Sequence, residues 1–392
     1  MINTTDFFTT LHQNGIDFFC GVPDSLLKHL CACISDNCAP DRHVICANEG
    51  NAIGLAAGYH LGTAKIAAVY MQNSGLGNAI NPLLSLTDPE VYSIPMLLII
   101  GWRGEPNIPD EPQHLKQGRI TETLLQNVGI PYQILDAESD YEEEISALLS
   151  LASSESRPVA LLVRKGTFLS YEKSPQNDST TPKSALMREE ALAIILQNMG
   201  DSLIISTTGK CSRELSELRE KRGETQRDFL TVGSMGHSSS IAAGVALTTP
   251  TRRVLCIDGD GAMLMHLGAM AVIGKLAPSN FIHILINNGC HESVGGQVSA
   301  ADIMDFEALA QACAYKAYYL AGNEAELNDA IQKCQKQPGP ILLEIKVKPG
   351  SRPDLGRPQG SPQDCKKRFM KQAELHTDST DFTDQESTDS TN

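Results

Sequence analysis

The sequence predicts an α/β protein made of two doubly wound parallel-sheet domains. Short apolar, β-branched runs alternate with helical segments through both halves of the chain, as in parallel sheets covered by helices on both faces. Between the halves, residues 167–187 are rich in Ser, Thr and Pro and have the composition of a linker. We therefore expect a first domain at 1–166 and a second at 188–365, without a middle domain.

Composition narrows the class of protein. The chain has 392 residues and a formal net charge of −15, which argues against a general binder of nucleic acids or anionic membranes. No apolar run is long enough to span a bilayer, and the N-terminus lacks the basic start of a secretory signal. Eleven cysteines without paired spacing are typical of free thiols, so a cytoplasmic location is expected. The acidic stretch 373–392 has too few apolar residues to fold alone and is predicted to be disordered.

In the first half, polar residues follow the predicted strands at their carboxyl ends, where the active sites of α/β proteins gather. Asp24 lies in the turn after the first strand, Glu49 follows the second, and Arg103 follows the fourth. Because Glu caps helices poorly, a functional role for Glu49 is favoured over a structural one. Asp24 could simply cap the helix that begins near Leu26. The predicted strands are 16–20, 43–46, 65–71, 96–100 and 158–163.

A long proline-rich stretch, residues 105–120, follows the fourth strand and is predicted to be a binding loop. It carries His114, Lys116 and Arg119. On so acidic a chain an anionic substrate would need local cations, and the two cations of this loop and Arg103 are candidates. Solvated surface charge is the simpler interpretation of the same side chains.

The most specific signal lies in the second half, where a predicted strand at 254–257 ends in the motif Asp-Gly-Asp-Gly. The glycines allow a sharp turn, and a helix is predicted over 262–273. A turn between a strand and the start of a helix can hold phosphate through backbone N–H groups. The residues of this predicted phosphate site are Gly259, Asp260, Gly261 and Ala262.

Two asparagines follow the next predicted strand, 281–286, and 25 residues separate Gly261 from the first of them. Because the carboxyl ends of parallel strands meet at one edge of a sheet, Asp260 and Asn288 should converge. Carboxylate and amide oxygens suit Mg²⁺, so the pair predicts a magnesium diphosphate site. An ordinary tight turn is the alternative for an isolated Gly-Asp-Gly. A nicotinamide site is not favoured, because no third glycine completes its fingerprint.

At this spacing, Gly-Asp-Gly and Asn-Asn resemble the cofactor motif of thiamine diphosphate enzymes. The resemblance covers the chain up to about residue 365, and the short linker sets the chain apart from larger decarboxylases of that family. Within the family, the sequence is most similar to phosphonopyruvate decarboxylases, with sulfopyruvate decarboxylases close to them. The stretches that carry this similarity are 21–27, 110–114, 116–119 and 288–297.

The resemblance implies how the cofactor and Mg²⁺ are held. Glu49 would hydrogen-bond the aminopyrimidine ring and favour its imino tautomer, whose nitrogen removes the thiazolium C2 proton. The carbonyl of Gly233 would accept a hydrogen bond from the exocyclic amine, and Met235 would hold the cofactor in its bent shape. The implied Mg²⁺ ligands are Asp260, Asn288 and the carbonyl of Cys290, and the implied diphosphate contacts include Thr208 and Gly209.

The resemblance also implies a reaction, the decarboxylation of 3-phosphonopyruvate to phosphonoacetaldehyde and CO₂. Such a reaction would serve the biosynthesis of 2-aminoethylphosphonate or of a phosphonate antibiotic. Asp24, His114 and His291 would be candidates for proton transfer, since a proton must be delivered after CO₂ leaves. The family further implies at least a homodimer, with active sites at the subunit interface.

Other activities stay open at this point. Decarboxylation of sulfopyruvate, or decarboxylation or carboligation of another 2-oxo acid, would use the same cofactor chemistry. A catalytically silent regulatory subunit that binds thiamine diphosphate is an alternative outside the enzymes. The presence of both Glu49 and the Asp260/Asn288 pair argues against silence, because a silent protein need not keep both halves of the site.

Overall fold

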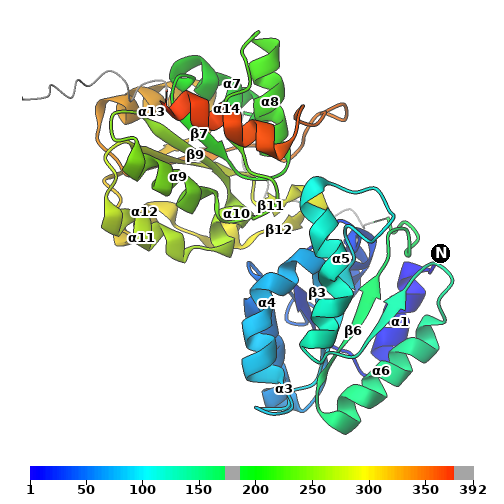
Figure 1. The fold of residues 1–392 in the computed structure, drawn as a ribbon. Coiled ribbons are helices and arrows are strands. Elements are labelled where there is room, and N and C mark those ends of the chain that lie inside the picture. Colours follow the sequence, from blue (N-terminus) through cyan, green and yellow to red (C-terminus); the bar gives the residue numbers. More distant parts are fainter. Residues whose placement is uncertain (173–185, 375–392) are drawn as a thin grey trace, which may run out of the picture.

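The computed structural model describes residues 1–172 and 186–374, which form two α/β domains (Figure 1). Most of the predicted linker and all of the acidic stretch beyond Glu374 lie outside the described residues. Within the described ranges, no helix combines the length and apolar character needed to cross a bilayer.

The first domain is built on a six-stranded, fully parallel sheet with the strand order β2-β1-β3-β4-β6-β5. Buried residues fill both faces of its central strands, as expected for a sheet covered on both sides. The strands are β1 (Phe19–Gly21), β2 (His43–Ile45), β3 (Ala67–Gln72), β4 (Met96–Gly101), β5 (Tyr132–Leu135) and β6 (Pro158–Val163).

Helices pack on both faces of this sheet and bury two separate apolar clusters. One face is covered by α1 (Thr4–Gln13), α2 (Lys28–Asn37) and α6 (Tyr141–Glu155). The other is covered by α3 (Glu49–Thr63), α4 (Leu76–Pro82) and α5 (Pro112–Asn127), with short turns at η1 (Asn73–Gly75) and η2 (Leu83–Thr87).

The second domain repeats this plan with the strand order β13-β14-β10-β9-β7-β8, again fully parallel. A small antiparallel pair, β11 with β12, follows the central strand β10. The strands are β7 (Leu203–Ser206), β8 (Phe229–Leu230), β9 (Val254–Gly259), β10 (Phe281–Asn287), β11 (Cys290–His291), β12 (Gln297–Val298), β13 (Ala317–Ala321) and β14 (Ile341–Lys346).

Helices of the second domain likewise bury an apolar cluster on each face of the sheet. One face carries α7 (Arg188–Met199), α8 (Lys210–Lys221) and α13 (Glu324–Lys336). The other carries α9 (Ser238–Thr248), α10 (Asp260–Met265), α11 (Gly268–Leu276) and α12 (Phe306–Ala312). Helix α14 (Pro362–Glu374) packs against the edge strand β8. Short helical turns lie at η3 (Glu292–Val294) and η4 (Ala300–Ile303).

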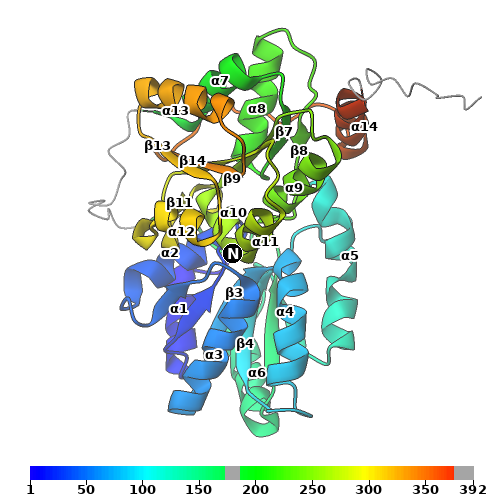
Figure 2. The ribbon, with the colours of Figure 1, turned by 90° about the vertical axis from the view of Figure 1, so that its left-hand side faces the viewer.

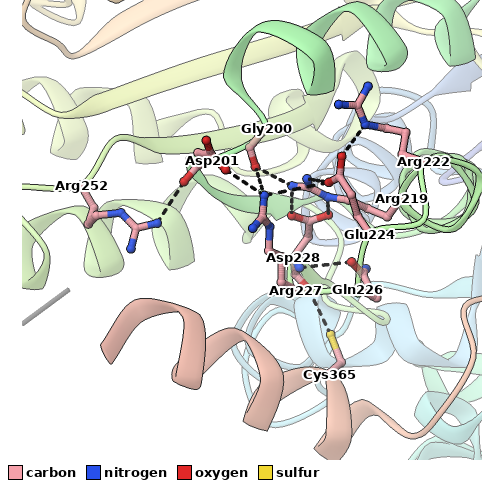
Figure 3. A network of polar contacts seen from close by, with 10 residues as sticks. All are labelled: Gly200, Asp201, Arg219, Arg222, Glu224, Gln226, Arg227, Asp228, Arg252 and Cys365. Carbon is pink, nitrogen blue, oxygen red and sulfur yellow. Dashed lines mark hydrogen bonds and ion pairs between the residues drawn. The ribbon is translucent and has the colours of Figure 1, made fainter. Parts of the chain in front are cut away.

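At the amino-terminal edge of this sheet, a buried ion-pair network joins the ends of α7 and α8 (Figure 3). The fully buried Arg219 donates to both carboxylate oxygens of Asp228, at 2.9 and 2.8 Å, and also pairs with Glu224. Arg219 and Arg227 both donate to the carbonyl of Gly200, where α7 ends. These contacts provide hydrogen bonds for a backbone carbonyl at the end of α7, and they lie away from the carboxyl ends of the strands.

The strand orders place a topological switch point in each sheet. The chain runs from β1 toward one side of the first sheet and from β3 toward the other, and the connections from β7 and β9 diverge in the same way in the second sheet. Ligands of open α/β sheets bind at the carboxyl ends of strands beside such a point. Asp24 follows β1, Thr208 and Gly209 lie between β7 and α8, and Asp260 follows β9, so the predicted sites occupy these positions.

The carboxyl edges of the two sheets lie close together in space within one chain (Figure 2). The side-chain nitrogen of Asn48, just before α3, donates to the carbonyl of Met265 at the end of α10 over 3.4 Å. A further ion pair joins Glu111 of the first domain to Arg357 of the second. The two predicted half-sites are therefore neighbours.

Two predicted elements differ from the structure. The predicted loop 105–120 is wrong beyond Glu111, because Pro112 occupies the first turn of α5, where a missing N–H costs nothing. The single helix predicted over 262–273 is broken: α10 ends at Met265 and His266 has a non-helical backbone. The other strands and α-helices that were not predicted are β5, β8, β11, β12, β13, α6 and α14.

Candidate active site

The carboxylate of Asp260 lies buried at the junction of β9 and α10 and is only 4% exposed. Its Oδ2 accepts a hydrogen bond from the hydroxyl of Ser299 at 2.5 Å. Burial raises the pKa of Asp260 to about 6, although hydrogen bonds from Ser299 and from the backbone of Gly261 and Gly289 oppose this shift. Within the described part of the chain no cationic side chain pairs with Asp260, so a bound cation would relieve its desolvation.

Asn288, directly after β10, is also buried and lies in the loop that leads to β11. Its Oδ1 accepts a hydrogen bond from the backbone N–H of Cys290 at 3.2 Å, and its Nδ2 donates to Glu292 at 3.0 Å. The preceding Asn287 instead turns into the sheet and donates to Glu344 at 2.8 Å. The amide oxygen of Asn287 also accepts a backbone hydrogen bond, from the N–H of Gly289 at 3.1 Å, so the two asparagines differ in the partner of the amide nitrogen.

The predicted diphosphate segments meet at the same edge. A Cβ on Gly261 would lie 2.8 Å from Cε1 of His291 and 3.6 Å from Cε of Met235, so these side chains pack directly on this glycine. Thr208 accepts a hydrogen bond from the backbone N–H of Gly233 at 3.2 Å. Gly209 has a φ of +94°, which favours glycine at the turn into α8. Gly259 and the buried Ala262 flank this turn at the end of β9.

Glu49 lies at the first position of α3 and is 6% exposed. Asn48 caps the helix by accepting from the N–H of Gly50, so Glu49 does not act as the cap. The side chain of Asn78 donates to Oε2 of Glu49 at 2.7 Å. A Cβ on Gly75 would lie 2.5 Å from Oε1, so only glycine leaves room for the carboxylate. The carboxyl group is therefore held in one orientation.

Asp24 is almost fully buried in the loop after β1 and lies against Gly101 at the end of β4. Its Oδ2 accepts from the N–H of Leu26 at 2.9 Å, while its Oδ1 has no hydrogen-bond partner among the described residues. The capping role considered for Asp24 is not found, because α2 begins at Lys28 and its N-cap position, Leu27, has no side-chain cap. Burial raises the pKa of Asp24 to about 6, against the opposing effect of the Leu26 N–H and of Arg103.

Arg103 already has protein partners. Its guanidinium donates to both oxygens of Asp110, at 2.8 and 2.5 Å, and to the hydroxyl of Ser25 at 2.9 Å. His114 lies buried nearby on α5, and burial lowers its pKa to about 4, so its imidazole is neutral near pH 7. Its Nδ1 has no hydrogen-bond partner within the described ranges. Burial also lowers the pKa of His291.

Lys116 and Arg119 are exposed on α5, away from the buried stripe of that helix. The stripe carries His114, Gly118 and Thr121, and it packs on the segment after β4 so closely that a Cβ on Gly118 would overlap the Gly104 carbonyl. The structure thus brings His114 to the Arg103 segment and leaves the two exposed cations on the outer face.

Comparison with known proteins places the chain in a family. The N-terminal TPP binding domain of thiamine pyrophosphate enzymes matches residues 3–125, and the C-terminal TPP binding domain matches residues 207–345. The chain is 35% identical over 387 residues to a phosphonopyruvate decarboxylase of Streptomyces viridochromogenes, covering 94% of each protein. The chain belongs to the phosphonopyruvate decarboxylase family of thiamine diphosphate enzymes.

Other members of the thiamine diphosphate enzymes show similar coverage. A phosphonopyruvate decarboxylase of Streptomyces hygroscopicus is 35% identical over 384 residues, with 94% of this chain and 93% of the relative covered. A sulfopyruvate decarboxylase of Methanosarcina acetivorans is 27% identical over 379 residues, with 92% and 94% covered. The predicted fold, two thiamine diphosphate-binding domains without a middle domain, is confirmed.

The residues present fit the cofactor of the thiamine diphosphate enzymes. Glu49 is a buried carboxyl group at the edge of the first domain, suited to a ring nitrogen of the aminopyrimidine. Asp260 and Asn288 offer oxygen atoms, the ligands that Mg²⁺ prefers, beside the glycine at which His291 and Met235 meet. Their roles stay predictions, but the donor set is the one that a magnesium diphosphate requires.

Sequence reasoning missed several residues that hold these groups. Asn78 and Gly75 orient Glu49, Ser299 donates to Asp260, and Glu292 binds the amide of Asn288. The glycine-rich stretch 72–78 was the one local signal, since a loop of that kind often approaches a ligand or a functional side chain closely.

Proposed function

We propose that the protein decarboxylates 3-phosphonopyruvate to phosphonoacetaldehyde and CO₂, using thiamine diphosphate and Mg²⁺. The observation that carries this proposal is the similarity to phosphonopyruvate decarboxylases along nearly the whole chain. The site geometry supports it, because Glu49 and the Asp260/Asn288 pair lie at neighbouring sheet edges. Sulfopyruvate decarboxylation is the second candidate, favoured by the more distant full-length relative.

When bound, the cofactor would supply a nucleophilic carbon for the 2-oxo group and a cationic thiazolium ring that accepts the electron pair released with CO₂. Glu49 would keep a proton at a nitrogen of the aminopyrimidine ring, which activates that carbon. Asn78 fixes Oε2 of Glu49, so the second carboxyl oxygen is the one free to share this proton. Asp260, Asn288 and the carbonyl of Cys290 would hold Mg²⁺.

After CO₂ has left, a proton must be delivered to the remaining carbon. Among the three predicted donors, Asp24 combines burial, an unpartnered Oδ1 within the described part of the chain, and a pKa of about 6. A carboxyl group with such a pKa can both hold and release a proton near neutrality. His114 and His291 have lowered pKa values and would serve better as neutral hydrogen-bonding groups.

Phosphonopyruvate should be turned over with a kcat/KM at least about 10²-fold above that of pyruvate, because a charged contact to the phosphonate is worth roughly 3 kcal/mol. The measurement is aldehyde formation from pyruvate, phosphonopyruvate and sulfopyruvate with thiamine diphosphate and Mg²⁺. Lys116→Ala and Arg119→Ala test the predicted substrate contacts, and each should reduce this ratio mainly by harming phosphonopyruvate.

Arg103 is the third predicted substrate contact, and its ion pair with Asp110 makes it more fixed than the two cations of α5. Lys65→Ala is a matched control, since this cation pairs with Asp17 at 2.6 Å and belongs to none of the predicted sites. A preference for sulfopyruvate, or equal use of pyruvate, would reject the proposed substrate and leave the cofactor assignment intact.

We further propose a homodimer in which Glu49 of one subunit meets Asp260 of the other. Mixing Glu49→Gln with Asp260→Ala subunits should then restore up to roughly a quarter of the sites, because mixed dimers hold one intact site of two. The contact of Asn48 with Met265 within one chain offers the alternative of a site inside a single subunit. In that case every site keeps one defect. Mass spectrometry would then show that the subunits have exchanged, but no decarboxylase activity would return.

A further inference from the structure

We propose that Glu292 is a positioning residue, which fixes the amide of Asn288 so that its oxygen faces Mg²⁺. The inference rests on the magnesium site of the proposed function and assigns a role to a residue outside the predicted ligand set. Glu292 begins the turn η3, directly after β11, and its side chain is only 12% exposed.

The carboxylate of Glu292 receives three side-chain hydrogen bonds. Oε1 accepts from Nζ of Lys210 at 2.7 Å. Oε2 accepts from Nη1 of Arg188 at 2.8 Å and from Nδ2 of Asn288 at 3.0 Å. The same carboxylate thus joins the first residue of α7, the first residue of α8 and the loop after β10.

The chemistry of this contact determines which end of the amide faces the cation. An ionised carboxylate has only acceptor oxygens, so the amide nitrogen of Asn288 must face Glu292. The amide oxygen then faces the other way, where its protein contact is the 3.2 Å hydrogen bond from the N–H of Cys290. One lone pair of Oδ1 is left for a metal ion. A neutral side chain at position 292 could also donate, which would allow the amide to turn over.

Glu292 is itself held in place by charge. Arg188 donates to both oxygens of Glu214, at 2.7 and 2.8 Å, and these two side chains are 7% and 1% exposed. Arg188 therefore cannot follow Glu292 if the loop moves. Two cations, Arg188 and Lys210, balance the two carboxylates, so the network remains neutral without using Asp260.

Glu292→Gln tests the role. We expect the affinity for Mg²⁺, measured by calorimetry at fixed thiamine diphosphate, to fall by about 10-fold to 100-fold, the usual cost of losing a partner of a metal ligand. At saturating Mg²⁺ and cofactor, kcat should stay close to that of the wild type, because Glu292 does not touch the reacting atoms. A loss of kcat without a loss of metal affinity would overturn the proposal.

A control variant separates positioning from a general loss of stability. Asp228→Asn disrupts the buried Arg219 pair (Figure 3), which lies at the amino ends of the strands of the same sheet and away from Glu292. It should lower the melting temperature and leave the Mg²⁺ affinity unchanged. If it weakens Mg²⁺ binding as much as Glu292→Gln does, the effect is general and the positioning role is wrong.

A paired exchange gives a second, independent readout. In Asn288→Asp/Glu292→Gln the introduced amide can donate to the introduced carboxylate, which leaves one carboxylate oxygen for Mg²⁺. Asn288→Asp alone sets two like charges against each other. The double variant should bind Mg²⁺ at least about tenfold more tightly than Glu292→Gln does. A gain of that size matches the usual loss of affinity when a metal ligand loses its hydrogen-bond partner. Failure of the folded double variant to recover would contradict the proposal. If the wild type itself binds thiamine diphosphate without Mg²⁺, the magnesium site of the proposed function fails instead.

Discussion

Glu49→Gln should lower kcat by a factor of about 10² or more, the usual contribution of a positioned acid–base group. Glutamine keeps the size of the side chain and can still meet the amide of Asn78, but it cannot share a proton with a ring nitrogen. Thiamine diphosphate affinity, measured by calorimetry, should stay close to that of the wild type, because the predicted diphosphate site lies in the other domain. The expected signature is a loss of turnover with cofactor binding retained.

Glu144→Gln is the matched control for this change. Glu144 is a partly buried carboxyl group of α6, which follows the edge strand β5, whereas Glu49 follows β2 at the opposite edge of the same sheet. Its removal should leave kcat unchanged. Near-wild-type turnover in Glu49→Gln, with the fold intact by circular dichroism, would remove Glu49 from the mechanism.

The positions of the strand ends could be predicted from the sequence because they depend on local patterns. Strand β9 is mostly a run of buried apolar residues and ends at Gly259, while β10 ends at Asn287 and Asn288 follows it directly. Parallel pairing of β9 with β10 then brings Asp260 and Asn288 to one edge without any further information. The same reasoning located Glu49 after β2 and Asp24 after β1.

The side chains that orient these residues could not be predicted, because their contacts join distant segments. Asn78 meets Glu49 across 29 residues of sequence, and Ser299 meets Asp260 across 39. The spacing of apolar residues in the sequence gives no information about a contact between two such distant side chains. Glu292 lies only four residues from Asn288, yet its role depends on Arg188 from another helix, 104 residues away in sequence.

The cations of α5 show how the secondary structure of a segment bears on the assignment of a site. Lys116 and Arg119 lie in the predicted binding loop, and an irregular loop sets no regular direction for its side chains. In a helix the direction of each side chain is set by its position, and His114 takes the buried face while these two take the exposed one. The prolines before α5 suggested a loop, although one of them occupies the first position of the helix.

Asp260→Ala should abolish Mg²⁺-dependent binding of thiamine diphosphate, with a loss of affinity of at least about 10²-fold, or roughly 3 kcal/mol. The carboxylate is the only charged ligand in the predicted set, since Asn288 and the carbonyl of Cys290 are neutral oxygen donors. Its burial makes the substitution informative, because the carboxylate is only 4% exposed and its loss removes the one acidic ligand of the predicted set from an enclosed position. Calorimetry of wild type and variant, with and without EDTA, gives the measurement.

Asp258→Asn separates loss of the metal ligand from loss of a buried carboxylate on the same strand. Asp258 is fully buried, accepts from the N–H of Gly259 at 3.0 Å, and lies 3.5 Å from Nε2 of His283 inside the sheet. Its replacement should lower the melting temperature and leave the Mg²⁺ dependence of cofactor binding unchanged. Unchanged cofactor affinity in Asp260→Ala, or wild-type binding that is insensitive to EDTA, would mean that the diphosphate is held by the protein alone. The Gly261 turn and Thr208 would then have to carry the full anionic charge with neutral donors, which the low dielectric around Asp260 makes unfavourable.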